Sequence, residues 1–250
     1  MASLNTAHKT LIIYGLIMVL AMVPTYIWSK LDSRTIREVG VWVKPMKFMA
    51  ATALFAITTA WLMLISGVSS EANPSLKWLA ILIVGTSSFE VGYITLQAII
   101  GEASHYNTSD SFHTVMSALM GLFAICLTAS QAILAWVIWT HNGNSTASVT
   151  LIGITVGLIL TFVLATVSGF LLGGNQPPQG MGLPIVGWHF YKDIRPSHFL
   201  GVHAQQFIPA FGLLADRFLG ESAYAGFTTM TVGYLLAWAS LTWTGLVGGR

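Results

Sequence analysis

Seven long apolar stretches, separated by short polar connections, constrain the fold of this chain most strongly. A stretch of about 20 apolar residues can cross a bilayer as a helix, and its backbone hydrogen bonds are then satisfied internally. Charged residues make up only 8% of the chain, against about 25% in a typical soluble domain. The sequence therefore predicts an all-α integral membrane protein, a bundle of seven transmembrane helices that forms one domain over residues 1–250. The expected spans are about 10–29, 47–67, 77–101, 112–140, 148–173, 198–218 and 223–247.

The distribution of lysine and arginine predicts the orientation of these helices. Short cytoplasmic loops carry an excess of basic residues. With the N-terminus outside and the C-terminus cytoplasmic, the loops 30–46, 102–111 and 174–197 share the cytoplasmic face of what we expect to be a bacterial inner membrane. The net charge of +2 is too small to indicate a nucleic-acid partner. The cytoplasmic side then holds Lys30, Arg34, Arg37, Lys44, Lys47, Lys192, Arg195 and Arg250, against Lys9, Lys77 and Arg217 outside.

The third expected span carries a stripe of polar residues. A carboxylate at this depth must be neutral, paired or bound to a metal, because an isolated charge in hydrocarbon is costly. Glu90 is therefore a candidate functional acid, and the alternative is a protonated side chain that hydrogen-bonds a neighbouring helix. On a period of 3.6 residues, the stripe contains Ser87, Glu90, Gln97, Gly101 and Ser104, with Tyr93 at its edge.

Four histidines near the predicted cytoplasmic face are candidate metal or haem ligands. Imidazole is the commonest metal ligand among side chains and suits zinc, copper and iron. His105 follows Glu102 in the third loop, and His113 lies in the first turn of the fourth span. His198 and His203 are five residues apart at the start of the sixth span, so on a regular helix they point about 140° away from each other. We therefore place His198 in the loop before that helix, from where it can turn inward.

Two loops on the same face carry side chains suited to a ligand. Lys44 and Lys47 flank Pro45 at the start of the second span. They are either held there by the excess of cytoplasmic basic residues or face an anionic group. The loop 174–197 is rich in glycine and proline but also contains aromatic residues. A loop of this length usually has a role, and we expect it to fold back over the end of the bundle as a lid or binding segment.

Three short polar motifs resemble a known family. KPMKF at 44–48, GEASHYN at 101–107 and DIRPSHFLGVHAQQFIP at 193–209 together resemble a family of small multi-pass bacterial membrane proteins of unassigned function. The resemblance spans most of the chain and implies a shared multi-pass fold, but no activity. It gives weight to the set Lys44, Lys47, His105, Asp193, Arg195, His198 and His203, whereas His113 lies outside the motif.

The first functional hypothesis is a membrane-embedded redox protein that binds haem b or a transition metal (iron, copper or zinc). His203, with His105 or His113, would ligate the cofactor, as helix bundles commonly house cofactors. Covalent haem attachment is excluded because the sequence has no CxxCH motif. Basic side chains would pair with haem propionates, an anionic quinone or a lipid head group. The candidate cofactor-binding residues are Lys44, Lys47, Arg195 and Gln206.

Two further hypotheses use the same residues. A zinc-dependent membrane hydrolase of a lipid-like substrate would hold zinc with His105, His198 and His203, and Glu90 or Glu102 would be the catalytic base. No HExxH motif supports it. A proton-coupled transporter or channel would use Glu90, Gln97, His203 and Gln206 as a polar path, which we expect to end near mid-membrane. The expected partners are the lipid bilayer and a quinone or lipid-like small molecule, with a homo-oligomer left open.

Overall fold

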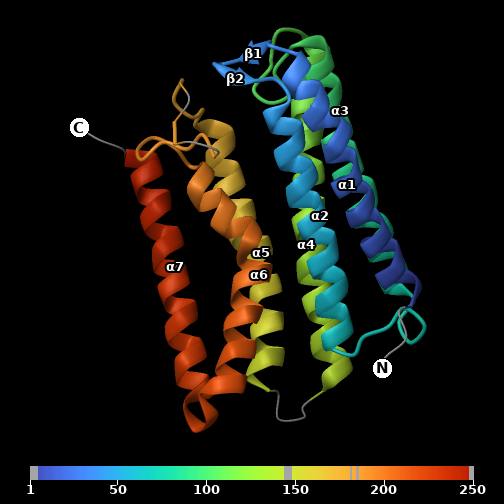
Figure 1. Cartoon of the computed structure of the whole chain (residues 1–250). Coiled ribbons are helices and arrows are strands. Elements are labelled where there is room, and N and C mark those ends of the chain that lie inside the picture. Colours follow the sequence, from blue (N-terminus) through green and yellow to red (C-terminus); the bar gives the residue numbers. More distant parts are fainter. Residues whose placement is uncertain (1–4, 144–147, 181, 184–185, 248–250) are drawn as a thin grey trace. The chain divides into compact units, whose positions relative to one another are not determined.

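The computed structural model describes residues 5–143, 148–180, 182, 183 and 186–247. In these residues the protein is almost entirely helical (Figure 1), which confirms the all-α class. A helix is present at each of the seven expected places. The helices are α1 (Thr6–Leu31), α2 (Val43–Ile65), α3 (Ser75–Ile100), α4 (Ser111–Asn142), α5 (Val149–Gly174), α6 (Arg195–Phe218) and α7 (Ala223–Val247). The smaller elements are the strands β1 (Thr35–Ile36) and β2 (Val39–Gly40) and the 3-10 turn η1 (Gly220–Ser222).

Six helical segments are long and apolar enough to cross a membrane. They indicate an integral membrane protein that lies in a lipid bilayer. Helix α6 is not among the six found in the described part of the chain, because its 24 residues include Asp216, Arg217 and several other polar side chains. The seventh crossing expected at 198–218 is therefore not confirmed. The six segments are Thr6–Leu31, Val43–Ile65, Ser75–Ile100, Ser111–Asn142, Val149–Gly174 and Gly220–Val247.

The chain divides into two compact units. The N-terminal unit consists of Met1–Leu64, Ser69–Leu127 and Gln179–Met181, so it holds α1, α2, α3, the hairpin and the first half of α4. The C-terminal unit consists of Ile65–Val68, Thr128–Pro178 and Gly182–Arg250, so it holds the rest of α4 together with α5, α6 and α7. The single domain expected from the sequence stays a prediction.

Local sequence signals explain where the helices of the N-terminal unit begin and end. Asn5 caps α1, because its side-chain oxygen accepts the backbone N–H of Ala7 at 3.0 Å. Asp110 caps α4 by accepting the backbone N–H of His113 at 3.0 Å. Aspartate is one of the residues preferred at this position of a helix. Helix α3 ends at Gly101, whose φ of 82° is the left-handed conformation that glycine adopts without strain.

The β1–β2 hairpin leads the chain from α1 into α2. Its two turn residues, Arg37 and Glu38, have φ of 53° and 66°, as a two-residue hairpin turn of the primed type requires. Arg34, one residue before β1, donates from Nη1 to the carbonyl oxygen of Ile99 at 3.0 Å. This hydrogen bond holds the hairpin against the end of α3 (Figure 1). Helix α2 follows the hairpin, and Lys44 lies in its first turn.

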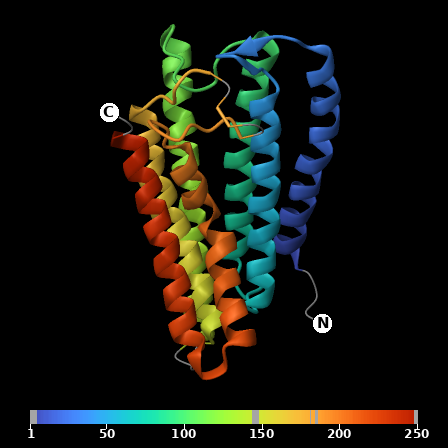
Figure 2. The ribbon, with the colours of Figure 1, turned by 60° about the vertical axis from the view of Figure 1, so that its left-hand side comes forward.

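Glycines bring α5 and α6 into close contact in the C-terminal unit, where α6 also packs against α7 (Figure 2). A Cβ on Gly212 would lie 2.7 Å from the carbonyl oxygen of Val149. A Cβ on Gly201 would lie 2.8 Å from the backbone of Leu164. Both distances are far below normal contact, so only glycine fits at this spacing. Small residues commonly serve this purpose between membrane helices.

Gly201→Ala should destabilise the protein by about 1–3 kcal/mol, the usual cost of overpacking a close-packed interior. The added methyl group must push α6 away from the backbone of α5. The measurement is thermal unfolding in detergent. The matched control is Gly233→Ala on α7, where an added Cβ meets nothing within 4 Å among the described residues. An equal loss of stability in both variants would show that the close helix contact is not the cause.

Candidate functional site

The polar stripe of α3 is buried inside the N-terminal unit. Glu90 is 5% exposed, Tyr93 5% and Gln97 4%. Ser87 is 1% exposed and Ser104, just beyond the helix, is 4% exposed. Side chains three and four residues apart are neighbours on a helix surface, so these groups follow one another along a single face. The stripe predicted from the helical period is therefore confirmed as an interior feature.

Lys44, at the start of α2, contacts the polar stripe at the C-terminal end of α3. Its Nζ donates to Ser104 Oγ at 2.7 Å and to His105 Nδ1 at 3.0 Å. The imidazole of His105 lies 6.0 Å from the ring of Phe48, measured between centroids. The predicted residues Lys44 and His105 thus lie together, and they contact each other directly. The excess of basic residues on one side does not by itself explain a lysine that binds a buried serine.

Glu90 lacks the hydrogen bonds that a buried carboxyl group normally has. Its Oε1 has no hydrogen-bond partner among the described residues, and the same is true of the Tyr93 hydroxyl and Gln97 Oε1. Lys44 is the charged group that interacts electrostatically with Glu90. Leaving a buried polar atom unpaired costs about 1–3 kcal/mol. Such atoms in native proteins call for an explanation, which is often a water molecule, an ion or a functional role.

Helix α1 adds two buried polar residues to this unit, Tyr14 and His8, which no pattern in the sequence predicted. Ser87 Oγ and Ser88 Oγ donate to the Tyr14 hydroxyl at 2.9 and 3.1 Å. Further towards the start of α1, His8 is 2% exposed, and neither ring nitrogen has a partner in the part of the chain that is described. It interacts electrostatically with Glu71. The expectation that a polar path ends near mid-membrane stays a prediction, and α1 adds Tyr14 and His8 to the buried polar residues of this unit.

His113 and Glu102 bind each other at the surface. His113 Nε2 lies 2.9 Å from Glu102 Oε2, and His113 Nδ1 lies 2.7 Å from Asp110 Oδ2. Hydrogen bonds from the backbone N–H and the side chain of His113 hold the pKa of Asp110 below its usual range. The two carboxylates are half exposed, so the ion pairs contribute little. Each ring nitrogen of His113 thus lies within ion-pair distance of a carboxylate oxygen.

In the C-terminal unit, His198 and His203 lie on different faces of α6. The helix begins at Arg195 and has proline in its first turn, which favours a helix start. The expectation that His198 precedes the helix is therefore wrong. Its Nδ1 forms a hydrogen bond with Ser168 Oγ on α5 at 3.1 Å. His203 Nδ1–H donates to Gln206 Oε1 at 3.2 Å, and the two imidazoles interact electrostatically.

The Arg195 side chain forms hydrogen bonds with the segment just before α6. Its Nε donates to Asp193 Oδ1 at 2.8 Å, and its Nη2 donates to Asp193 Oδ2 at 2.7 Å and to the carbonyl oxygen of Gly187 at 2.6 Å. The backbone N–H of His189 also donates to Asp193, at 2.8 Å. Asp193 is 3% exposed and organises the segment before α6. The sequence singled out Asp193 only as part of the motif at 193–209. It did not predict that Asp193 accepts the hydrogen bonds at the centre of this loop.

The remaining candidates divide between the two units. Lys47 is exposed in the first turns of α2. His105 and His113 belong to the N-terminal unit, and His198, His203 and Gln206 to the C-terminal unit. Within the described ranges, no group of three or more histidine, cysteine, aspartate or glutamate side chains is placed to hold a metal ion. The predictions of haem, a transition metal or zinc stay predictions.

The N-terminal unit offers chemistry suited to proton exchange. It combines a buried carboxyl group, a lysine bound to an imidazole, a tyrosine between two serines and a buried histidine. Chains of such groups form proton relays in pumps and transporters. Comparison with protein-family models, curated proteins and solved structures found no match for the chain.

Proposed function

We propose that the protein conducts protons across a bacterial inner membrane, as a channel or proton-coupled transporter, through the interior of its N-terminal unit. The observation that carries the proposal is the buried carboxyl group of Glu90, whose Oε1 has no hydrogen-bond partner among the described residues. A carboxyl group in this setting can take up and release a proton without first breaking a hydrogen bond at that oxygen. Lys44 is the charged group that interacts electrostatically with it.

The other polar groups supply the steps on either side of Glu90. Towards the end of α3 these are Gln97, Ser104 and the Lys44–His105 pair. Towards its beginning they are the Tyr14 hydroxyl and then His8. Glu90 lies ten residues before the end of α3 at Ile100, which corresponds to about 15 Å along the helix axis. Steps of this length need bridging water, and the unpaired oxygens of Tyr93 and Gln97 are suitable partners for it.

The proposal includes seven crossings with the N-terminus outside. Helix α6 has 24 residues, which at 1.5 Å per residue give about 36 Å, more than the roughly 30 Å of a hydrocarbon core. Its polar side chains His203 and Gln205 are buried, so they need not face lipid. The basic residues before and within the hairpin support a cytoplasmic position for that end of α2. Arg250, which enters the same charge count, lies outside the described residues.

Proton flux into liposomes tests the proposal. Purified protein is reconstituted with potassium inside, valinomycin imposes a negative interior, and a trapped pH dye reports acidification. We expect faster acidification than in protein-free vesicles. No difference between the two would contradict the proposal, and a Soret band in the optical spectrum of the same sample would favour the haem hypothesis instead.

Tyr14→Phe should slow this flux about fivefold, because losing a hydroxyl group that links the α1 and α3 parts of the path costs about 1 kcal/mol. The measurement is the initial rate of acidification at equal protein content. Tyr26→Phe is the matched control, since Tyr26 is 54% exposed on the same helix. Equal rates in the wild type and Tyr14→Phe would remove α1 from the path.

A further inference from the structure

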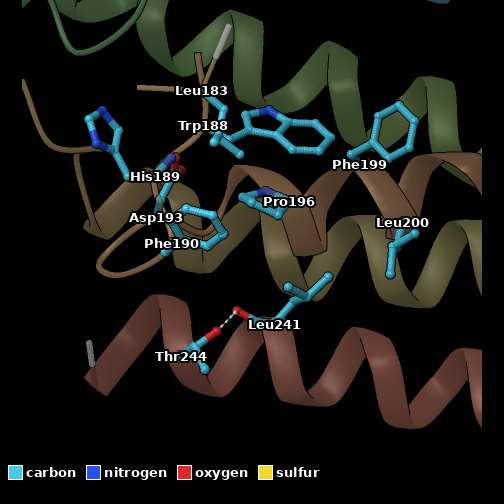
Figure 3. A pocket seen from close by; sticks show the side chains of 10 residues that line it. All are labelled: Leu183, Trp188, His189, Phe190, Asp193, Pro196, Phe199, Leu200, Leu241 and Thr244. Atoms are coloured by element: carbon cyan, nitrogen blue, oxygen red, sulfur yellow. Dashed lines mark hydrogen bonds between the residues drawn. The ribbon is translucent and has the colours of Figure 1, made fainter. Parts of the chain in front are cut away.

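An apolar cavity of about 260 Å³ lies in the C-terminal unit, where the 186–194 segment meets α6 and α7. Figure 3 shows Leu241 on α7 pointing toward Phe190 and Pro196. Phe199 and Leu200 of α6 complete the apolar lining. Pockets that enclose most of a small-molecule ligand usually measure roughly 300–1,000 Å³. This cavity is smaller, so it suits one part of a longer apolar molecule.

Two polar side chains of the lining, Thr244 and Asp193, have hydrogen-bond partners within the chain. Thr244 Oγ1 donates to the carbonyl oxygen of Leu241 at 3.2 Å. The Asp193 carboxylate accepts four hydrogen bonds, from Arg195 and from the N–H of His189. His189 Nε2 has no hydrogen-bond partner among the described residues, but most of the ten lining side chains are apolar. An alkyl chain is the ligand that this interior suits.

A cation lies beside the cavity. Lys192 stands in the chain between the lining residues Phe190 and Asp193, and its backbone N–H donates to the carbonyl oxygen of Thr244 at 3.4 Å. Its side chain is exposed, and no ion pair is found for it among the described residues. The φ of Lys192 is 55°, a conformation that costs a non-glycine residue energy. Phe190 and Tyr191, next to it, are 75% and 59% exposed.

We propose that the C-terminal unit binds one anionic phospholipid, with an acyl chain in this cavity and the phosphate against Lys192. Exposed aromatic and basic side chains are typical of the membrane interface, and lysine near that interface attracts anionic lipids. The apolar interior would hold the acyl chain of such a lipid, and the exposed aromatic residues would lie at the membrane interface. Lys192, for which no ion pair is found among the described residues, would bind the phosphate of the head group. This inference is independent of proton conduction, because it uses no residue of the N-terminal unit.

Native mass spectrometry of the full-length protein tests the proposal, with dioleoyl-phosphatidylglycerol and dioleoyl-phosphatidylcholine added at equal concentration. We expect one phosphatidylglycerol per chain, bound about fivefold more tightly than phosphatidylcholine. Lys192→Gln should remove this preference and leave weak binding of both lipids. Lys77→Gln, at an exposed lysine of α3, is the matched control and should keep the preference.

Leu200→Trp and Leu241→Trp fill the cavity from α6 and from α7, and each should abolish binding of both lipids. Thermal unfolding identifies any variant that fails to fold, and two variants on different helices keep the test decisive. Equal binding of the two lipids by the wild type would overturn the proposal. So would undiminished binding in both tryptophan variants, or an equal loss of preference in Lys77→Gln. Competition by sn-glycerol-1-phosphate alone would also overturn it, because the cavity would then have no part in binding.

Discussion

Glu90→Gln should abolish proton conduction by the reconstituted protein, with a loss of roughly 100-fold, the scale on which positioned proton-transfer groups act. Glutamine has the shape of glutamate but cannot release a proton. In the proposed path the proton passes through this position, and glutamine leaves no ionisable group there. The measurement is the initial rate of vesicle acidification under an imposed potential. The effect exceeds that of Tyr14→Phe, because a bridging water can replace a lost hydroxyl group but not a lost acid.

The fold should survive this substitution. Glu90 Oε1 forms no hydrogen bond with the described residues, and an uncharged amide is cheaper to bury than a carboxylate. We expect the thermal midpoint of Glu90→Gln to equal or exceed that of the wild type. Glu221→Gln is the matched control, since Glu221 is an exposed acid in η1. Wild-type flux in Glu90→Gln would refute a path through this residue, whatever its stability.

Asp193→Asn should lower the free energy of unfolding by about 2–4 kcal/mol, the cost of removing one partner from a buried, charged hydrogen-bond network. The carboxylate is fully buried and accepts from Arg195 and from two backbone N–H groups. The side-chain NH₂ of asparagine is itself a hydrogen-bond donor, so it cannot accept hydrogen bonds from these groups. The segment before α6 should then detach from the end of α7, which thermal unfolding and limited proteolysis at 186–194 would detect.

The same carboxylate makes stability depend on pH. Burial opposes the ionisation of Asp193, but the hydrogen bonds from Arg195 and from the backbone N–H of His189 outweigh it and hold its pKa below the usual value. A lowered pKa stabilises the fold above the unfolded value of about 4, and this stabilisation is lost as the pH falls through the folded pKa. The difference in thermal midpoint between the wild type and Asp193→Asn should therefore be constant near neutral pH and shrink below about pH 4. A difference that does not change with pH would show that Asp193 acts by shape alone. Glu221→Gln serves as the control here as well.

The sequence by itself determined the helices and the polar face of α3. Apolar run length, helical period and capping residues act within a few turns of one helix, so they can be read without knowing what packs against it. Asp110 caps α4, and Glu90 and Gln97 are buried on one face. Local signals also placed a polar, motif-bearing segment before α6. They could not show that Asp193, rather than a histidine, organises it.

Only the tertiary structure decided which side chains meet. Lys44 and His105 are 61 residues apart, and Tyr14 and Ser87 are 73 apart. No periodicity within one helix encodes contacts over such separations, because they depend on how neighbouring helices pack. The same holds for His198, which contacts Ser168 of α5 from within α6, 30 residues away in the chain. A histidine in a sequence has the chemistry of a ligand, but the groups that pack around it determine whether that chemistry is available.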